Sequence, residues 1–265
     1  MATVKANGID VHYVMEGPAD GPVVTMSHSL MTTLEMWDPQ VKPLVDRGFR
    51  VLRYDTRGHG GSSVAEPPYT LDMLAADAAA MLEALGIHQT HFVGLSMGGM
   101  IGQTLALARP DLLKTLTLCD TSSGYPPEAA AMWTDRIKGA EQNGMEPAVA
   151  GTIERWFSPT FAAANDAALA PVREMIRGTP VKGFVGCCHA ISKLAVTDKI
   201  SAIRVPTLII VGEDDPGTPV AMHVTIKERI AGSQMVIIPD ARHLSNIEAV
   251  EPFNAALLRF LQAHR

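Results

Sequence analysis

A serine stands among three glycines in the stretch HFVGLSMGGMIG, which runs from His91 to Gly102. Within it, Gly94-Leu95-Ser96-Met97-Gly98 matches the pattern G-x-S-x-G, in which a serine occupies a strained turn between a strand and a helix. Glycines on either side remove side chains that would collide in such a turn, and the helix start directs free N–H groups toward the serine oxygen. THFV before the motif favours a strand and GMIGQTLALA after it favours a helix. We therefore predict that Ser96 is a nucleophile.

A serine nucleophile needs a base, and the base needs an acid that orients it. LIIVGEDDPGTP carries Asp214 and Asp215 just after one predicted strand, and MVIIPDARHLSNIE carries His243 just after the next. Because the carboxyl ends of parallel strands meet at one edge of a sheet, these residues are expected at the same crevice as Ser96. We predict His243 as the base and Asp215 as the acid. Asp120, at the end of the preceding strand, and Asp214 are the alternatives for the acid.

The oxyanion that forms during attack by a serine needs two hydrogen-bond donors. The backbone N–H of Met97, next to the nucleophile, is expected to supply one of them. The second is expected from Leu30, in the loop that follows VVTMSHSL. Both donors belong to the backbone, so their side chains are free to line an acyl pocket.

The other histidines are given plainer roles. His59, in DTRGHGGS, is expected to support the floor of the crevice, and His189 to line a lid. The remaining ones are interpreted as surface or strand-edge residues: His12, His88, His91, His223 and His264.

Short apolar runs that alternate with amphipathic stretches must position these residues. The first two runs flank Asn7-Gly8, a pair favoured in tight hairpin turns. Further strands are predicted at 22–28, 49–55, 90–95, 113–120, 205–212 and 233–240, the last four buried on both faces. Helices are predicted at about 70–85, 98–109, 218–231 and 248–263. This alternation predicts a doubly wound, mostly parallel α/β sheet of about eight strands.

One region lacks strand signals, from Thr121 to about Lys199. It is too long for a structureless loop in a compact domain, and its Ala-rich stretches favour helices. We predict a helical cap inserted after the strand that ends near Asp120. The predicted organisation is a core formed by 1–121 and 200–265, with the cap at 122–199.

Composition limits the partners. The chain has 265 residues, 47% of them hydrophobic, and a net charge of −6, which is typical of a soluble globular protein. The negative charge argues against nucleic acid or an anionic membrane as the main partner. No apolar run approaches the roughly 20 residues of a membrane span, and no secretory signal pattern is expected. We therefore expect a small-molecule partner, and a homo-oligomer is left open.

Cysteine usage points to a reducing compartment. Cys119, Cys187 and Cys188 are an odd number, and two of them are adjacent, so they do not suggest a disulfide framework. Cys187 and Cys188 are expected to be buried small hydrophobes rather than a redox pair. No zinc spacing or phosphate-binding loop is found, so neither a metal nor a cofactor is expected. We expect a cytoplasmic protein.

Several longer stretches resemble a known family. RYDTRGHGGS, GLSMGG, VPTLIIVGEDD and ARHLSNIE are similar to α/β-hydrolase-fold enzymes. SHSLMTTLEMWDPQV, MWTDRIKGAEQNGM, ERWFSPTF and GFVGCCHAI look like segments of 3-oxoadipate enol-lactonases of the β-ketoadipate pathway. The chain departs from them at His28, where they usually have Asn, and at Met31, where they have Gly.

The resemblance implies hydrolysis of a small enol-lactone to a keto acid in aromatic catabolism. It suggests substrate contacts at Ser29, Trp133, Arg136 and Trp156, although cap packing is an alternative for the two tryptophans. A substrate carboxylate would need a cation, for which Arg136, Arg155 and Lys138 are candidates, each with a solvated helix face as the alternative. Two other functions stay open, which are a small-ester carboxylesterase with side perhydrolase activity and a ligand receptor without turnover.

Overall fold

The computed structural model describes residues 2–126 and 128–265. An eight-stranded sheet forms its centre, with the strand order β1-β2-β4-β3-β5-β6-β7-β8. β1 and β2 pair antiparallel, β2 pairs antiparallel with β4, and the remaining pairs are parallel. The strands are β1 (Ala2–Ala6), β2 (Ile9–Glu16), β3 (Val23–Ser27), β4 (Arg50–Tyr54), β5 (Thr90–Leu95), β6 (Leu113–Cys119), β7 (Thr207–Gly212) and β8 (Gln234–Ile238).

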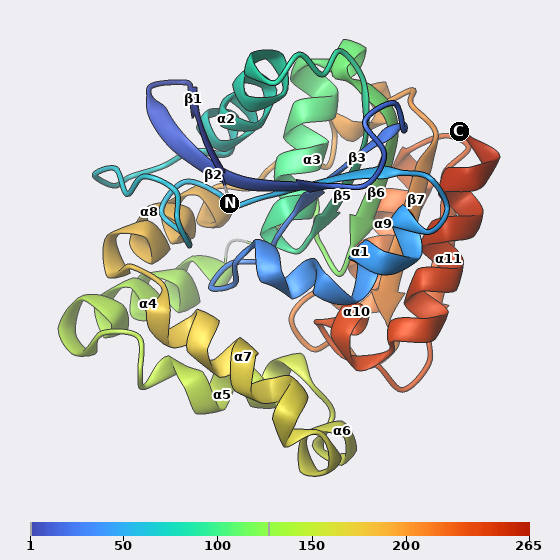
Figure 1. Ribbon diagram of the computed structural model, residues 1–265. Helices are drawn as coiled ribbons and strands as arrows, with labels where there is room; N and C mark the ends of the chain where they lie inside the picture. The colour runs from blue at the N-terminus through green and yellow to red at the C-terminus, as the bar shows by residue number, and fades with distance from the viewer. Residues whose placement is uncertain (1, 127) are drawn as a thin grey trace.

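Helices pack on both faces of this sheet (Figure 1). The helix pair α2 (Leu71–Ala84) and α3 (Met97–Ala108) is in contact, as is the pair α1 (Asp38–Val45) and α11 (Val250–Ala263). α9 (Val220–Arg229) packs on β7 and β8, and the short α10 (Ser245–Glu248) packs on α11. The mostly parallel, doubly wound sheet predicted from the sequence is therefore confirmed.

Local sequence signals account for the first hairpin and for the start of α2. Asn7 and Gly8 both have positive φ, of 46° and 79°, and the strands that they join pair from Ala6 and Ile9 outward, as the hairpin prediction required. Thr70 caps α2 by accepting a hydrogen bond from the Met73 N–H.

One expectation about the elements is wrong, and a core helix is missing from the predicted elements. β8 is an edge strand with exposed residues, and 44% of the Ile237 surface is accessible, so it is not buried on both faces. Its apolar sequence does not reveal that no further strand pairs beyond it. The sequence also gave no prediction of α1, because Pro39 and Pro43 mask its helical pattern; Pro39 lies in the first turn, where proline is tolerated.

Five helices follow β6 and precede β7, and most of them gather below the sheet in Figure 1. They are α4 (Ala129–Asn143), α5 (Ala148–Trp156), α6 (Pro159–Ala164), α7 (Asp166–Gly178) and α8 (Val181–Ser192). We call this group the lid. Among the helices in the described ranges, none is both long and apolar enough to cross a membrane.

The lid is fixed to the sheet layer through two glycines of α8. A Cβ on Gly183 would lie 1.9 Å from the Gly58 carbonyl oxygen, and one on Gly186 would lie 2.6 Å from the Tyr69 ring. The Tyr69 N–H donates to the Gly186 carbonyl across 3.3 Å. These glycines let α8 contact the loop after β4 backbone to backbone, which any side chain would prevent.

We expect the substitution Gly183→Ala to lower the free energy of unfolding by about 1–3 kcal/mol, because the new methyl group cannot be accommodated without a backbone shift. Gly178→Ala is the matched control, since a Cβ at the end of α7 would contact nothing within 4 Å. That control should leave stability unchanged or raise it slightly. Thermal unfolding of both variants measures the difference, and equal midpoints would contradict this account of the α8 contact.

Candidate active site

Ser96 lies at the turn between β5 and α3 with φ 54° and ψ −114°, a strained conformation for a residue with a side chain. Two close approaches explain the neighbouring glycines. A Cβ on Gly94 would lie 2.2 Å from the Gly98 carbonyl oxygen, and one on Gly98 would lie 2.1 Å from the Ser27 carbonyl oxygen. The Ser96 N–H donates to the Cys119 backbone carbonyl oxygen at 2.9 Å, and this hydrogen bond connects the turn to β6. The strand–turn–helix geometry that the G-x-S-x-G pattern indicates is present.

His243 and Asp215 meet at the carboxyl edge of the sheet, beyond β8 and β7. The His243 Nδ1–H donates to Asp215 Oδ2 across 2.8 Å, which leaves Nε2 free to act. The same carboxylate accepts hydrogen bonds from the backbone N–H groups of Gly217 at 2.8 Å and Thr218 at 3.1 Å, and from the Thr218 hydroxyl at 2.6 Å. Asp214 is exposed, so Asp215 is the member of the pair that reaches the histidine.

The surroundings of Asp215 favour the ionised form of its carboxyl group. Burial alone would raise the pKa of Asp215, but the attraction of His243 and the hydrogen bonds to the carboxylate outweigh it and lower the pKa to about 2. Burial alone would lower the pKa of His243, yet the neighbouring Asp215 carboxylate raises it above its ordinary value. The histidine is therefore a stronger base than a free imidazole.

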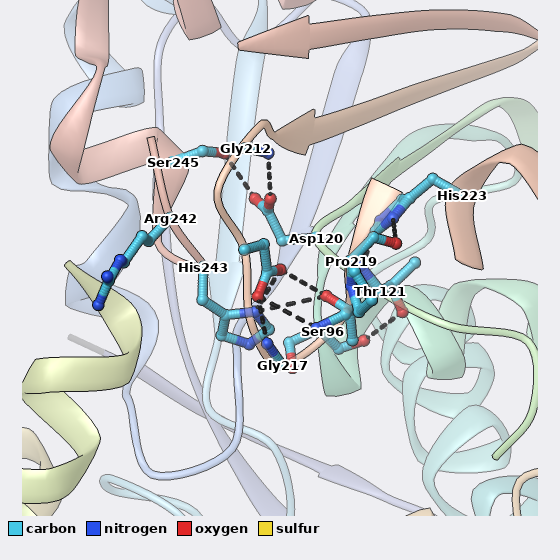
Figure 2. Close-up of polar contacts among 12 residues, drawn as sticks. Ser96, Asp120, Thr121, Gly212, Gly217, Pro219, His223, Arg242, His243 and Ser245 are labelled. Carbon is cyan, nitrogen blue, oxygen red and sulfur yellow. Dashed lines mark hydrogen bonds and ion pairs between the residues drawn. The ribbon is translucent and has the colours of Figure 1, made fainter. Parts of the chain in front are cut away.

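Asp120, the alternative acid, has different partners (Figure 2). Its Oδ1 accepts from the Gly212 N–H at 2.8 Å and its Oδ2 from the Ser245 hydroxyl at 2.5 Å. Burial raises the pKa of this carboxyl, and the nearby Asp215 charge raises it further. Gly212 precedes the loop of Asp215, and Ser245 follows His243 by two residues. Asp120 therefore joins the two loops that carry the acid and the histidine.

The interpretation of His223 and His91 as surface or strand-edge residues is wrong, because both are buried. His223 Nε2 accepts from the Thr121 N–H at 2.8 Å, beside the serine turn, and Figure 2 shows this contact. His91 Nδ1 lies 2.9 Å from the Thr115 hydroxyl, between β5 and β6. Burial lowers the pKa of each to about 4, so both are neutral at pH 7. Their burial depends on how distant segments pack, which a single sequence does not show.

The loop after β3 is held by a series of hydrogen bonds. The Ser29 N–H donates to Met36 Sδ at 3.2 Å, the Met31 N–H to His59 Nε2 at 3.2 Å, and the Thr32 N–H to the Ser29 carbonyl at 3.3 Å. The Leu30 N–H is not among the donors found in the described residues. Thus His59 supports this loop as expected, and Leu30 N–H is left available.

Met31 has φ 65°, in the left-handed region that favours glycine. A non-glycine residue there carries strain on the order of 1 kcal/mol. Its N–H bond to His59 fixes the peptide that carries the strain. The backbone conformation thus fits the sequence expectation that related proteins have glycine at this position.

One cavity of about 280 Å³ is lined by most of the predicted site residues, with Asp215 and Met97 outside its lining. Ser96, His243, Leu30 and Ser29 line it from the core, while Trp133, Arg136, Arg155 and Trp156 line it from the lid. The Trp156 ring stacks on His243, with ring centres 6.1 Å apart and an angle of 30° between the planes.

Lys138 is exposed, and it is not among the described residues that line the cavity, so the third lid cation is in the wrong place for a substrate carboxylate.

Three polar groups of the cavity wall lack a protein partner within the described residues. Ser29 Oγ and Trp133 Nε1 are buried and form no hydrogen bond. The Arg136 guanidinium lies 4.8 Å from the Trp133 ring centre and 5.6 Å from that of Phe184, and no carboxylate within the described ranges forms an ion pair with it. Buried polar groups are normally satisfied. Of the three, Arg136 is the one whose charge lines the cavity without a carboxylate partner, so it is available to an anionic ligand.

Hydrogen bonds between the lid and the histidine loop were not evident from the sequence. The Leu244 N–H donates to the Trp156 carbonyl at 3.2 Å, and the Arg242 guanidinium to the Glu154 carbonyl at 2.5 Å. Glu248 accepts from the Ser158 N–H at 2.8 Å and from the Arg242 N–H at 2.7 Å. The end of α5 is therefore attached to the segment that carries His243.

The cysteines show no sign of redox chemistry. Cys119, Cys187 and Cys188 are buried free thiols, and burial raises the pKa of each. Among the described residues, no group of three or more His, Cys, Asp or Glu side chains could hold a metal ion.

The fold and this site match a known family: residues 22–250 fit the family described as alpha/beta hydrolase fold, and the chain belongs to that family. It is 37% identical to 3-oxoadipate enol-lactonase 1 of Acinetobacter baylyi over 90% of this chain and 88% of that protein. The enol-lactonase structure from Burkholderia xenovorans LB400 superposes with a TM-score of 0.94 at 34% identity, covering 98% of this chain and 100% of the other. An esterase from Thermogutta terrifontis, solved with malate bound, gives 0.94 at 28% identity, covering 100% and 99%.

The pKa differences predict a distinct titration of His243. In the wild type its imidazole should titrate above pH 6.5, whereas His91 should titrate near pH 4. Asp215→Asn removes the charge that raises the pKa of His243, so burial should then lower it below 6.5, while Asp120→Asn should change it less. NMR of labelled histidines measures these values, with His91 as the internal reference. A larger shift in Asp120→Asn than in Asp215→Asn would contradict the assignment.

Proposed function

We propose that the protein is a serine hydrolase that opens a small enol-lactone bearing a carboxylate, with 3-oxoadipate enol-lactone as the best candidate. The observation that carries the proposal is the shared cavity. The Ser96 nucleophile and His243, which is hydrogen-bonded to Asp215, line it from the core, and the unpaired Arg136 lines it from the lid. Resemblance to enol-lactonases over most of the chain supports the same substrate.

The first half of the reaction forms an acyl-enzyme. Ser96 Oγ attacks the lactone carbonyl carbon while His243 Nε2 takes its proton, and Asp215 stabilises the imidazolium that results. The N–H groups of Leu30 and Met97 donate to the carbonyl oxygen as it becomes an oxyanion. The ring C–O bond then breaks, the enol oxygen receives the proton from His243, and the enol tautomerises to a ketone.

The second half releases the acid. His243 takes a proton from a water molecule, which attacks the acyl carbon and forms a second oxyanion in the same position. Collapse of this intermediate returns the proton to Ser96 Oγ and frees a carboxylate. An enol is a better leaving group than an ordinary alcohol, so the first half needs little help beyond this triad.

Substrate recognition is assigned to the unsatisfied groups of the wall. Arg136 would bind the carboxylate of the lactone, because a guanidinium offers a paired set of donors to two oxygens. Ser29 and Trp133 line the same cavity and are assigned to further substrate contacts, and Trp156 packs beside His243. The free buried thiols agree with a reducing cytoplasm, where we place the protein and its part in aromatic catabolism.

A second candidate is a carboxylesterase for small esters. The apolar part of the cavity favours it, since Met100, Ile191 and Met31 would hold a neutral acyl chain as readily as a lactone ring. The similarity to an esterase structure supports it as well.

Covalent labelling tests the nucleophile. A fluorophosphonate probe should label the wild-type protein, and Ser96→Ala should abolish labelling, because the probe requires an activated serine. Mass spectrometry of the labelled peptide locates the adduct. Failure of the folded wild type to react would favour a receptor without turnover over any hydrolase.

Steady-state kinetics distinguishes the two hydrolase candidates. For the lactonase, kcat/KM for 3-oxoadipate enol-lactone should exceed that for p-nitrophenyl acetate by well over tenfold, as expected when a site binds the charged arm of its substrate. Arg136→Met should reduce this ratio about tenfold or more, because the carboxylate loses its charged partner. Equal values for the two substrates in the wild type would favour the esterase.

A further inference from the structure

A second cavity lies between α4 and α5, and we call it the lid crevice. Its volume is about 270 Å³, close to that of the catalytic cavity. Arg136 and Arg155 line both cavities, whereas Gly139, Asn143 and Gly151 line only the lid crevice. The two arginines therefore stand at the boundary between the reacting centre and this part of the lid.

The two arginines lack the carboxylate partners that other arginines of the chain have. Arg57, for example, forms an ion pair with Asp77 at 2.6 Å. Within the described ranges neither Arg136 nor Arg155 forms an ion pair, and Arg155 donates only to the Thr152 hydroxyl, at 3.2 Å. Loss of water around them lowers the pKa of both guanidinium groups, and Arg155 lowers that of Arg136 further by repulsion. Two neighbouring cations without an ion-pair partner favour an anion between them.

Glycines keep the lid crevice open. A Cβ on Gly139, in α4, would contact nothing within 4 Å, and one on Gly151, in α5, would meet only Arg155 Nη1 at 3.9 Å. Neither glycine is needed for close helix packing, in contrast to Gly183. Each lowers helix stability by about 1 kcal/mol relative to alanine. Because these two glycines have no side chain, they leave free volume beside the arginines.

We propose that the lid crevice is an extension of the substrate site that binds the carboxylate end of long anionic acyl chains at Arg155, beyond the position served by Arg136. The proposal rests on the serine hydrolase function proposed above. It names a substrate class, namely esters and lactones whose acyl part ends in a carboxylate. A short acyl chain would place its carboxylate at Arg136, and a longer one would pass into the lid crevice toward the exposed Arg155.

A series of p-nitrophenyl hemiesters tests this extension. The acyl groups are succinate, adipate and suberate. Each hemiester is compared with the diester in which its free carboxylate is methylated, which keeps the p-nitrophenyl ester and a similar shape without the charge. In the wild type, kcat/KM for the suberate hemiester should exceed that for its methyl diester by about tenfold. Gly151→Leu, which fills the lid crevice, should lower the suberate-to-succinate ratio of kcat/KM by about tenfold. Gly139→Leu fills the same space from α4 and should do the same.

Gly178→Leu is the matched control, because it also places leucine at an open glycine of a lid helix but away from both cavities. It should leave the ratio at the wild-type value. At Arg155, substitution by Met should remove the charge preference for suberate, and Arg155→Lys should keep most of it. Equal loss for succinate and suberate in Gly151→Leu, or no charge preference for suberate in the wild type, would overturn the proposal.

The hemiester series also separates this proposal from the lactonase function. A protein that cleaves the hemiesters but not the enol-lactone would contradict the proposed natural substrate, while the ratios above would still decide on the lid crevice.

Discussion

The close approach of α3 to β5 and β3 is the constraint on which the site depends. Helix α3 begins so near the sheet that the backbone carbonyls of Gly98 and Ser27 lie where the Cβ atoms of Gly94 and Gly98 would be. The chain can connect strand and helix at this distance only through a strained residue, and that residue is Ser96, with φ 54°. The strain is maintained by the packing of the whole sheet. It places a serine side chain at the first turn of a helix, where N–H groups have no partner inside the helix.

Around the Ser96 turn, several titratable side chains are buried, and burial favours their neutral forms. His91 and His223 are buried, and burial holds the pKa of each near 4, so they act as neutral hydrogen-bonding groups between segments. Asp120 is buried with a raised pKa, and its two hydrogen bonds join the segments that carry Asp215 and His243. The charge on Asp215 is the exception, since it is stabilised by three hydrogen bonds from Gly217 and Thr218 and by a fourth from the histidine. The pair can therefore exchange a proton without competition from its neighbours.

The lid supplies the arginines of the catalytic cavity, Arg136 and Arg155, whereas the described core residues that line it include no lysine or arginine. It is attached at two places of different character. The glycines of α8 allow backbone contact with the loop after β4, and the end of α5 is hydrogen-bonded to the histidine segment. Arg136 and Arg155 line the lid crevice between α4 and α5. The lid is thus held to the core at these two places and still leaves free volume beside the arginines, an arrangement suited to a substrate arm of variable length.

The sequence by itself determined the alternation of the core strands and most of their helices, the serine turn, and His243 as its base, because these depend on local patterns and on the rule that parallel strand ends share one edge. It left Asp120 and Asp214 as alternatives to Asp215, and the contact between Asp215 and His243 in the structure made that choice. It also indicated the hairpin at Asn7-Gly8. Tertiary structure alone decided which histidines are buried, that β8 is an edge strand, and that Arg136 and Arg155 face the cavity while Lys138 faces solvent. The physical reason is that burial and the pairing of charges depend on which distant segments come into contact, and a pattern along one chain carries no record of its neighbours in space.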